Sequence, residues 1–165
     1  MRANTLPAAF AAAALFPQAA LAQSVLLDCE VTMNSRTAYL GRPSSATQES
    51  GRWRFRLDPN ASTAALVSTG TLYISAGGEH PFRTDGQPIP LTATEDAYSM
   101  CLDRAGACNT RRALSFGDWH EVELAHIDRR TGDFLVREHH YVGDLQGGGT
   151  HEYHGTCARA PEQQF

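Results

Sequence analysis

The chain has 165 residues and a formal net charge of −4, and its 14 basic residues are all arginine. The excess of acidic groups argues against nucleic acid and against an anionic membrane surface as partners. No apolar stretch comes near the roughly 20 residues that a membrane-spanning helix needs, so we expect no membrane span.

The N-terminus has the pattern of a secretory signal peptide. Arg2 supplies a positive charge, residues 6–16 form a short apolar run, and Ala20-Leu21-Ala22 presents a small-x-small cleavage pattern. We therefore predict a signal peptide over residues 1–22 and a single β domain over residues 23–165. That domain would be periplasmic or secreted. An uncleaved N-terminal anchor is the alternative.

After the signal segment, apolar and polar residues alternate along most of the chain, which is typical of β-strands. In the segment 52–57, three arginines alternate with two aromatic residues and a leucine, so each set occupies one face of a strand. Turn-forming residues separate the alternating stretches, among them the run Gly147-Gly148-Gly149. We predict strands at 25–33, 52–57, 64–67, 71–75, 89–92, 97–102, 111–116, 119–127, 134–142 and 150–157.

About 8–10 short strands with short connections predict an all-β fold. We expect a small antiparallel up-and-down barrel, lipocalin-like in architecture, or a β-sandwich. An eight-stranded barrel is wide enough to hold one small ligand or to be filled by its own side chains. The apolar residues on nearly every predicted strand favour a filled interior.

All four cysteines follow the predicted signal peptide, and none lies within it. An even number of cysteines in an exported chain predicts disulfides, because the compartment beyond the inner membrane is oxidising. We favour the pairs Cys29–Cys157, which would join the two ends of a closing sheet, and Cys101–Cys108, which would close a local loop. The spacings lack the paired C-x-x-C motifs of a four-cysteine zinc site.

One segment near the C-terminus has the sequence Ile127-Asp128-Arg129-Arg130-Thr131-Gly132-Asp133-Phe134, and Gly155-Thr156-Cys157 follows it later. Together they resemble a pattern found in small exported β-rich proteins of proteobacteria that remain uncharacterised. This resemblance implies a fold and a compartment but no activity. The Thr-Gly-Asp tripeptide predicts a tight turn, since glycine tolerates positive φ. We expect Asp128 to accept a hydrogen bond from a turn amide or to pair with an adjacent arginine.

Histidines are concentrated in the last two predicted strands. We predict a hairpin in which Val142 faces Thr150. This register places four side chains on one face, namely Glu138, His140, Glu152 and His154. Two imidazoles and two carboxylates predict a site for Zn²⁺, Cu²⁺ or Ni²⁺. The alternatives are hydrated Glu–His pairs on a solvated face and a pH sensor.

Three arginines share one face of the predicted strand at 52–57: Arg52, Arg54 and Arg56. Such a stripe predicts binding of a carboxylate, a sulfate or a phosphate, or of an acidic partner. The alternative is a solvent face whose charges discourage pairing with other sheets.

The sequence contains no G-x-S-x-G, H-E-x-x-H, P-loop or G-x-G-x-x-G motif. We therefore predict a non-catalytic domain that binds a protein partner or a small ligand and needs no cofactor. The second hypothesis is a periplasmic metal-binding protein that uses the C-terminal histidines to hold Zn or Cu. The third is a hydrolase-type enzyme.

Overall fold

The computed structural model describes residues 24–69, 82, 86–114, 117–143 and 146–161. The predicted signal peptide and the predicted strand at 71–75 lie outside these residues. The described part of the chain forms strands and no α-helix, which confirms the all-β prediction. The strands are β1 (Val25–Tyr39), β2 (Ser45–Asp58), β3 (Thr63–Ser68), β4 (Ile89–Ala93), β5 (Ala97–Met100), β6 (Arg112–Ala113), β7 (Trp119–Val122), β8 (Ala125–Asp128), β9 (Asp133–Val142) and β10 (Gly147–Arg159).

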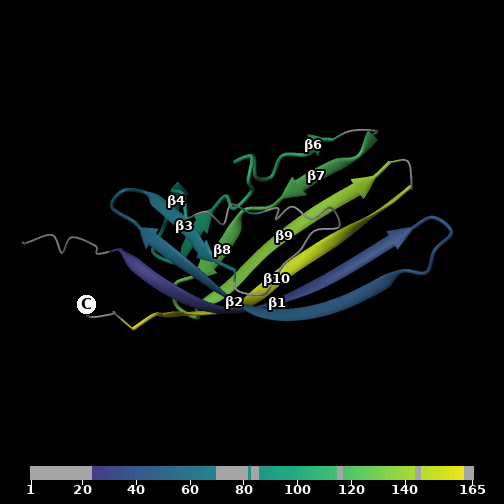
Figure 1. Ribbon diagram of the computed structural model, residues 1–165. Coiled ribbons are helices and arrows are strands. Elements are labelled where there is room, and N and C mark those ends of the chain that lie inside the picture. The colour runs from purple at the N-terminus through teal and green to yellow at the C-terminus, as the bar shows by residue number, and fades with distance from the viewer. Residues whose placement is uncertain (1–23, 70–81, 83–85, 115–116, 144–145, 162–165) are drawn as a thin grey trace, which may run out of the picture.

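These strands form one antiparallel sheet that curves into a barrel-like ring (Figure 1). The ring has the strand order β10-β1-β2-β3-β4-β5-β8-β9, and β9 pairs with β10 to close it. Nearly every strand therefore pairs with its neighbours along the chain, as in the predicted up-and-down arrangement. β8 and β7 pair with successive parts of β9, and β6 pairs with β7.

The ring is complete at only one end. β3 pairs with β2 only between Arg54 and Asp58, whereas β2 and β1 remain paired back to Ser45. At the other end, the sheet consists of the strands β2, β1, β10, β9, β7 and β6, in this order. Among the described residues, β2 and β6 do not pair with each other, so this end of the ring is open. We call this half of the sheet the open end; it lies to the right in Figure 1.

Several strand boundaries differ from the predicted ones, including the end of β1, which lies at Tyr39 rather than at residue 33. β2 begins at Ser45 rather than at residue 52. The prediction missed residues 45–50 because they are exposed on both faces and so show no alternation. The predicted strand at 119–127 is divided into β7 and β8. In each case hydrogen bonding to neighbouring strands, rather than hydrophobic pattern, decides the boundary.

Both predicted disulfides are present. Cys29 and Cys157 are directly opposed in the β1–β10 pair, with their Cα atoms 3.9 Å apart, so this bridge joins the first strand to the last. Cys101–Cys108 closes the loop that follows β5. Two disulfides fit a protein of the periplasm or of the extracellular space. Among the described residues, no helix is long and apolar enough to cross a membrane.

Aromatic side chains fill the closed end of the ring. Trp53 is fully buried, and its ring lies 5.4 Å from that of Phe82, 5.5 Å from that of Phe134 and 5.3 Å from that of Tyr153. Centroid distances in this range are favourable for tilted and edge-to-face aromatic pairs. The closed end is therefore filled by its own side chains, as predicted.

The predicted register of the last hairpin is wrong. Val142 faces Gly147 and not Thr150, a shift of three residues. The three glycines that we assigned to a turn belong to β10, where backbones approach closely: a Cβ on Gly148 would overlap the carbonyl oxygen of His140. Because side chains alternate along a strand, this odd shift sends each predicted pair of partners to opposite faces.

Candidate functional site

The inner face of the open end is polar. Strand pairing places His120 of β7 opposite His140 of β9, and Glu138 of β9 opposite His151 of β10. Tyr153 follows His151 on the same face of β10. Glu138 and His151 are only 6% and 8% exposed. We call these five residues the polar cluster.

Hydrogen bonds link part of the polar cluster to β6. Arg112 Nη2 of β6 lies 3.3 Å from His120 Nδ1, and His120 Nε2 lies 2.8 Å from Glu138 Oε1. A guanidinium only donates hydrogen bonds, so Nδ1 of His120 accepts, and the proton of the neutral ring is on Nε2, which donates to Glu138. The contact with Arg112 therefore favours the His120 tautomer that carries its proton on Nε2.

Tyr153 completes this chain of hydrogen bonds. Its hydroxyl donates to Glu138 Oε2 over 3.4 Å. Burial raises the pKa of Tyr153, and the nearby Glu138 carboxylate raises it further, so the hydroxyl keeps its proton and remains a donor. Glu138 thus receives one hydrogen bond at each oxygen.

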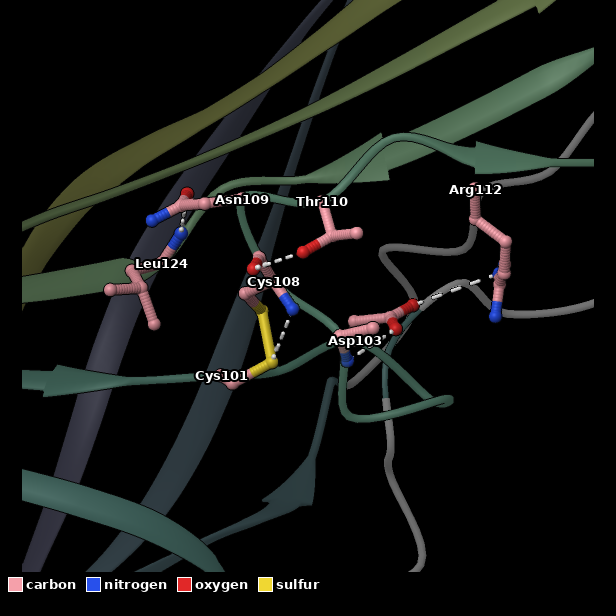
Figure 2. Close-up of a disulfide and its surroundings, with 8 residues drawn as sticks. Cys101, Asp103, Cys108, Asn109, Thr110, Arg112 and Leu124 are labelled. Carbon is pink, nitrogen blue, oxygen red and sulfur yellow. Dashed lines mark hydrogen bonds and ion pairs between the residues drawn. A yellow bond between two sulfur atoms is a disulfide. The ribbon is translucent and has the colours of Figure 1, made fainter.

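The disulfide loop lies beside Arg112, as Figure 2 shows. Asp103 of this loop is 3% exposed, and its Oδ1 lies 3.9 Å from Arg112 Nη2. The loop is tied to the β7–β8 connection, since the backbone N–H of Leu124 donates to Asn109 Oδ1 over 3.1 Å. The Cys101–Cys108 bridge therefore helps to position the arginine that orients His120.

His140 and His151 form a stacked pair, with ring centroids 5.6 Å apart and planes inclined by 10°. His140 Nε2 and His151 Nδ1 are buried and have no hydrogen-bond partner among the residues that the structure describes. Burial lowers the pKa of both imidazoles, although the carboxylate of Glu138 partly opposes this. Both rings are therefore neutral at neutral pH, and each has one unsatisfied nitrogen.

A hollow of about 450 Å³ lies beside the polar cluster. Its lining comes from five strands and the turn between β1 and β2, and consists of Arg36, Thr37, Ala38, Ser44, Ser45, Ala46, Trp119, His139, His140, Gly148, Gly149 and Thr150. None of the lining residues that the structure describes is acidic, although the chain as a whole carries a net charge of −4. The lining offers an arginine, two imidazoles and four hydroxyl groups.

Trp119 gives the hollow an aromatic wall. Its ring stacks on Tyr141 at a centroid distance of 6.0 Å and an angle of 11°. The guanidinium carbon of Arg111 lies 4.1 Å from the Trp119 ring centroid. The indole is thus held between a cation and a second ring, which fixes its orientation.

The predicted set of four metal ligands does not form. Glu138 and His140 point inward, whereas Glu152 and His154 lie on the outer face, because of the shifted register. Glu152 accepts a hydrogen bond of 2.7 Å from Arg137 Nε instead. In the part of the chain that the structure describes, no three His, Cys, Asp or Glu side chains are gathered around one metal position.

The arginine stripe lies on the outer face of β2, and two of its members have acidic partners on β1. Arg54 donates two hydrogen bonds to Asp28, of 2.6 and 3.0 Å, which lowers the pKa of Asp28 and raises that of Arg54. Arg52 lies 3.5 Å from Glu30. Arg56 faces an apolar residue of β1. Anion binding by this stripe stays a prediction.

Sequence reasoning missed His120, His151 and Tyr153 as members of one cluster. A run of three glycines predicts a loop as readily as a close-packed strand, so the register was underdetermined. It also missed Arg36 and Trp119, because it did not predict that their segments lie side by side at the open end. The sequence did contain one sign that β1 is longer than predicted: no turn-forming glycine or proline follows residue 33 until Gly41.

No protein-family model, curated protein or solved structure matches this chain. The resemblance to small exported β-rich proteins therefore stays a prediction. The function has to be argued from the geometry and the chemistry of the open end.

Proposed function

We propose that the protein is an exported, non-catalytic β domain that binds a small organic anion in the hollow at the open end. The signal-peptide pattern at residues 1–22 and the two disulfides support export. The closed end of the ring is filled, and the hollow at the open end is lined mostly from outward-facing strand positions, among them those of Arg36, Trp119 and His139. The single observation that carries the proposal is the charge of the lining.

The lining favours an anion because its charged and titratable side chains are an arginine and two histidines, in a chain that is acidic overall. The guanidinium of Arg36 is suited to pair with a carboxylate through two parallel hydrogen bonds. Serine and threonine hydroxyls add further donors. A volume of about 450 Å³ lies within the range of small-molecule sites.

The aromatic wall favours a ligand with a planar apolar part. The ring of Trp119 is already oriented by Tyr141 and Arg111, so contact of a ligand with the edge of this ring costs little additional ordering. A ligand that combines a ring with a carboxylate would use both Trp119 and Arg36. This chemistry defines a small aromatic carboxylate as the ligand class.

Intrinsic tryptophan fluorescence tests this function, because Trp119 lines the hollow whereas Trp53 is buried in the core. The full chain is titrated with benzoate and, separately, with benzyl alcohol, which has the same ring but no charge. We expect saturable binding of benzoate and at least about tenfold weaker binding of benzyl alcohol, the size of one lost charge-assisted hydrogen bond.

Arg36→Gln is expected to weaken benzoate binding about tenfold or more. Arg56→Gln, which removes an exposed arginine on β2 away from the hollow, is the matched control and should bind as the unaltered chain does. Equal affinity for benzoate and benzyl alcohol, or unchanged benzoate binding in Arg36→Gln, would contradict the proposed function.

A further inference from the structure

Two buried nitrogens of the polar cluster have no hydrogen-bond partner in the described part of the chain. They are His140 Nε2 and His151 Nδ1, on rings that stack at 5.6 Å. A buried polar atom without a hydrogen bond destabilises the fold, because its hydration is lost and nothing replaces it. Two such atoms on adjacent rings are therefore expected to be retained for a ligand that satisfies both.

A carboxylate lies beside these two rings. Glu138 is directly opposite His151 and two residues from His140 on the same strand face. Its Oε1 is used by His120 at 2.8 Å, whereas its Oε2 has only the longer contact with the hydroxyl of Tyr153 at 3.4 Å. Oε2 therefore has a lone pair available for a cation.

We infer that Glu138, His140 and His151 bind one divalent transition-metal ion of the class of Cu²⁺ or Zn²⁺ on the inner face of the open end. Two imidazoles and one carboxylate are ligands that both ions accept, and water can occupy the remaining coordination positions. This site differs from the predicted set of four, since it excludes the outward-facing Glu152 and His154.

His120 is not a ligand in this site, although it lies nearby. Arg112 donates to its Nδ1, so the ring proton is on Nε2, the nitrogen that faces Glu138. A histidine that binds a metal through one nitrogen needs an acceptor, and not a guanidinium, at the other. His120 therefore orients the carboxylate of Glu138.

The three donor groups have to turn toward a common point, because no three such side chains are gathered around one position in the described residues. The ring of His140 packs over its partner in β10, Gly149, where a side chain would collide with Cε1, so this glycine makes room for the imidazole on the inner face. His140 also lines the hollow. Burial keeps both imidazoles neutral at neutral pH, and this is the form that binds a metal.

Calorimetric titration of the untagged full chain, with both disulfides formed, tests the inference with CuCl₂ and ZnCl₂ as the only added ions. We expect one equivalent of metal to bind at pH 7.5, and His151→Gln to weaken binding at least about tenfold. His151 does not line the hollow, so this variant leaves the proposed ligand site intact. Loss of metal binding and loss of benzoate binding can therefore be distinguished.

His154→Gln and His126→Gln are the matched controls. His154 lies on the outer face, and His126 is exposed and hydrogen-bonded to Ser99. Both should bind the metal as the unaltered chain does. If His154→Gln loses affinity while His151→Gln keeps it, the site is on the outer face and the inference is overturned.

A spectroscopic readout on the unaltered chain keeps the test valid if a variant folds poorly. The electron paramagnetic resonance spectrum of the Cu²⁺ complex should show hyperfine coupling to two imidazole nitrogens. In His151→Gln, checked for folding by near-ultraviolet circular dichroism, it should show coupling to one. The absence of one-equivalent binding, or a spectrum without imidazole coupling, would refute the site.

Discussion

Gly132 and Cys157 are joined through their backbones: the N–H of Cys157 donates to the carbonyl oxygen of Gly132 over 2.8 Å. Gly132 has φ +80°, and a Cβ there would overlap the carbonyl oxygen of Cys157. Asp128 Oδ1 accepts hydrogen bonds from the amides of Thr131 (2.9 Å) and Arg130 (2.7 Å), which lowers the pKa of Asp128. The predicted turn is thus confirmed, and it packs against the strand that carries the long-range disulfide.

Gly132→Ala is expected to lower the free energy of unfolding by about 3 kcal/mol, because alanine disfavours positive φ and its Cβ would meet backbone. Gly106→Ala is the control, since Gly106 also has positive φ (+72°) but a Cβ there would meet no other atom within 4 Å. That control should cost only about 1 kcal/mol. Urea unfolding measures both, and equal losses would show that the contact with Cys157 is unimportant.

The two disulfides should differ in their contribution to stability. Cys29–Cys157 spans 128 residues and Cys101–Cys108 spans 7. In the chain-entropy model the long bridge stabilises by about 5 kcal/mol and the short one by about 2.5 kcal/mol. Denaturant midpoints of the two double Cys→Ser variants test this order. A larger loss from removing the short bridge would contradict it.

Glu138→Ala is expected to destabilise the fold by about 3 kcal/mol, because it leaves the buried donors of His120 and Tyr153 without an acceptor. Glu152→Ala removes a partly exposed carboxylate on the outer face of the same hairpin and should cost less than about 1 kcal/mol. Thermal unfolding of both variants at pH 7 distinguishes the two positions. Similar losses would mean that the inner hydrogen-bond chain adds no stability.

Acidification should weaken the fold below about pH 6.5. Burial holds the pKa of His140 and His151 below 6.5 in the folded protein, so the unfolded chain binds protons first as the pH falls. The stability due to the neutral rings is complete above pH 6.5 and is lost as the pH falls through the folded-state pKa values. The slope is at most about 1.4 kcal/mol per pH unit for each ring.

Melting temperatures between about pH 8 and about pH 5 measure this dependence. His151→Gln removes one of the two rings and should flatten the profile. The pKa values of Asp28 and Asp128 are lowered, so these two carboxylates change stability only below about pH 4, outside this window. A profile in His151→Gln as steep as that of the unaltered chain would assign the dependence to other groups.

Local pattern was sufficient to predict the closed end of the ring. Inward residues of β1 such as Cys29 and Val31 alternate with outward ones, because one face of the sheet is buried and the other is solvated. The pattern failed at residues 45–50 of β2, which are exposed on both faces and therefore carry no periodic signal. At the open end the buried positions are polar, among them Ser35, Glu138 and His151, so hydrophobic alternation does not mark the inner face there.

By itself, the sequence determined the all-β class, the antiparallel arrangement and the two disulfides, since alternation and cysteine positions are local properties of the chain. The tertiary structure alone decided which histidines meet inside. Gly147, Gly148 and Gly149 permit either a turn or a close-packed strand, and only contact with β1 and β9 selects the strand. Because side chains alternate with a period of two, that choice of register decides which of the hairpin's acidic and imidazole groups face the interior.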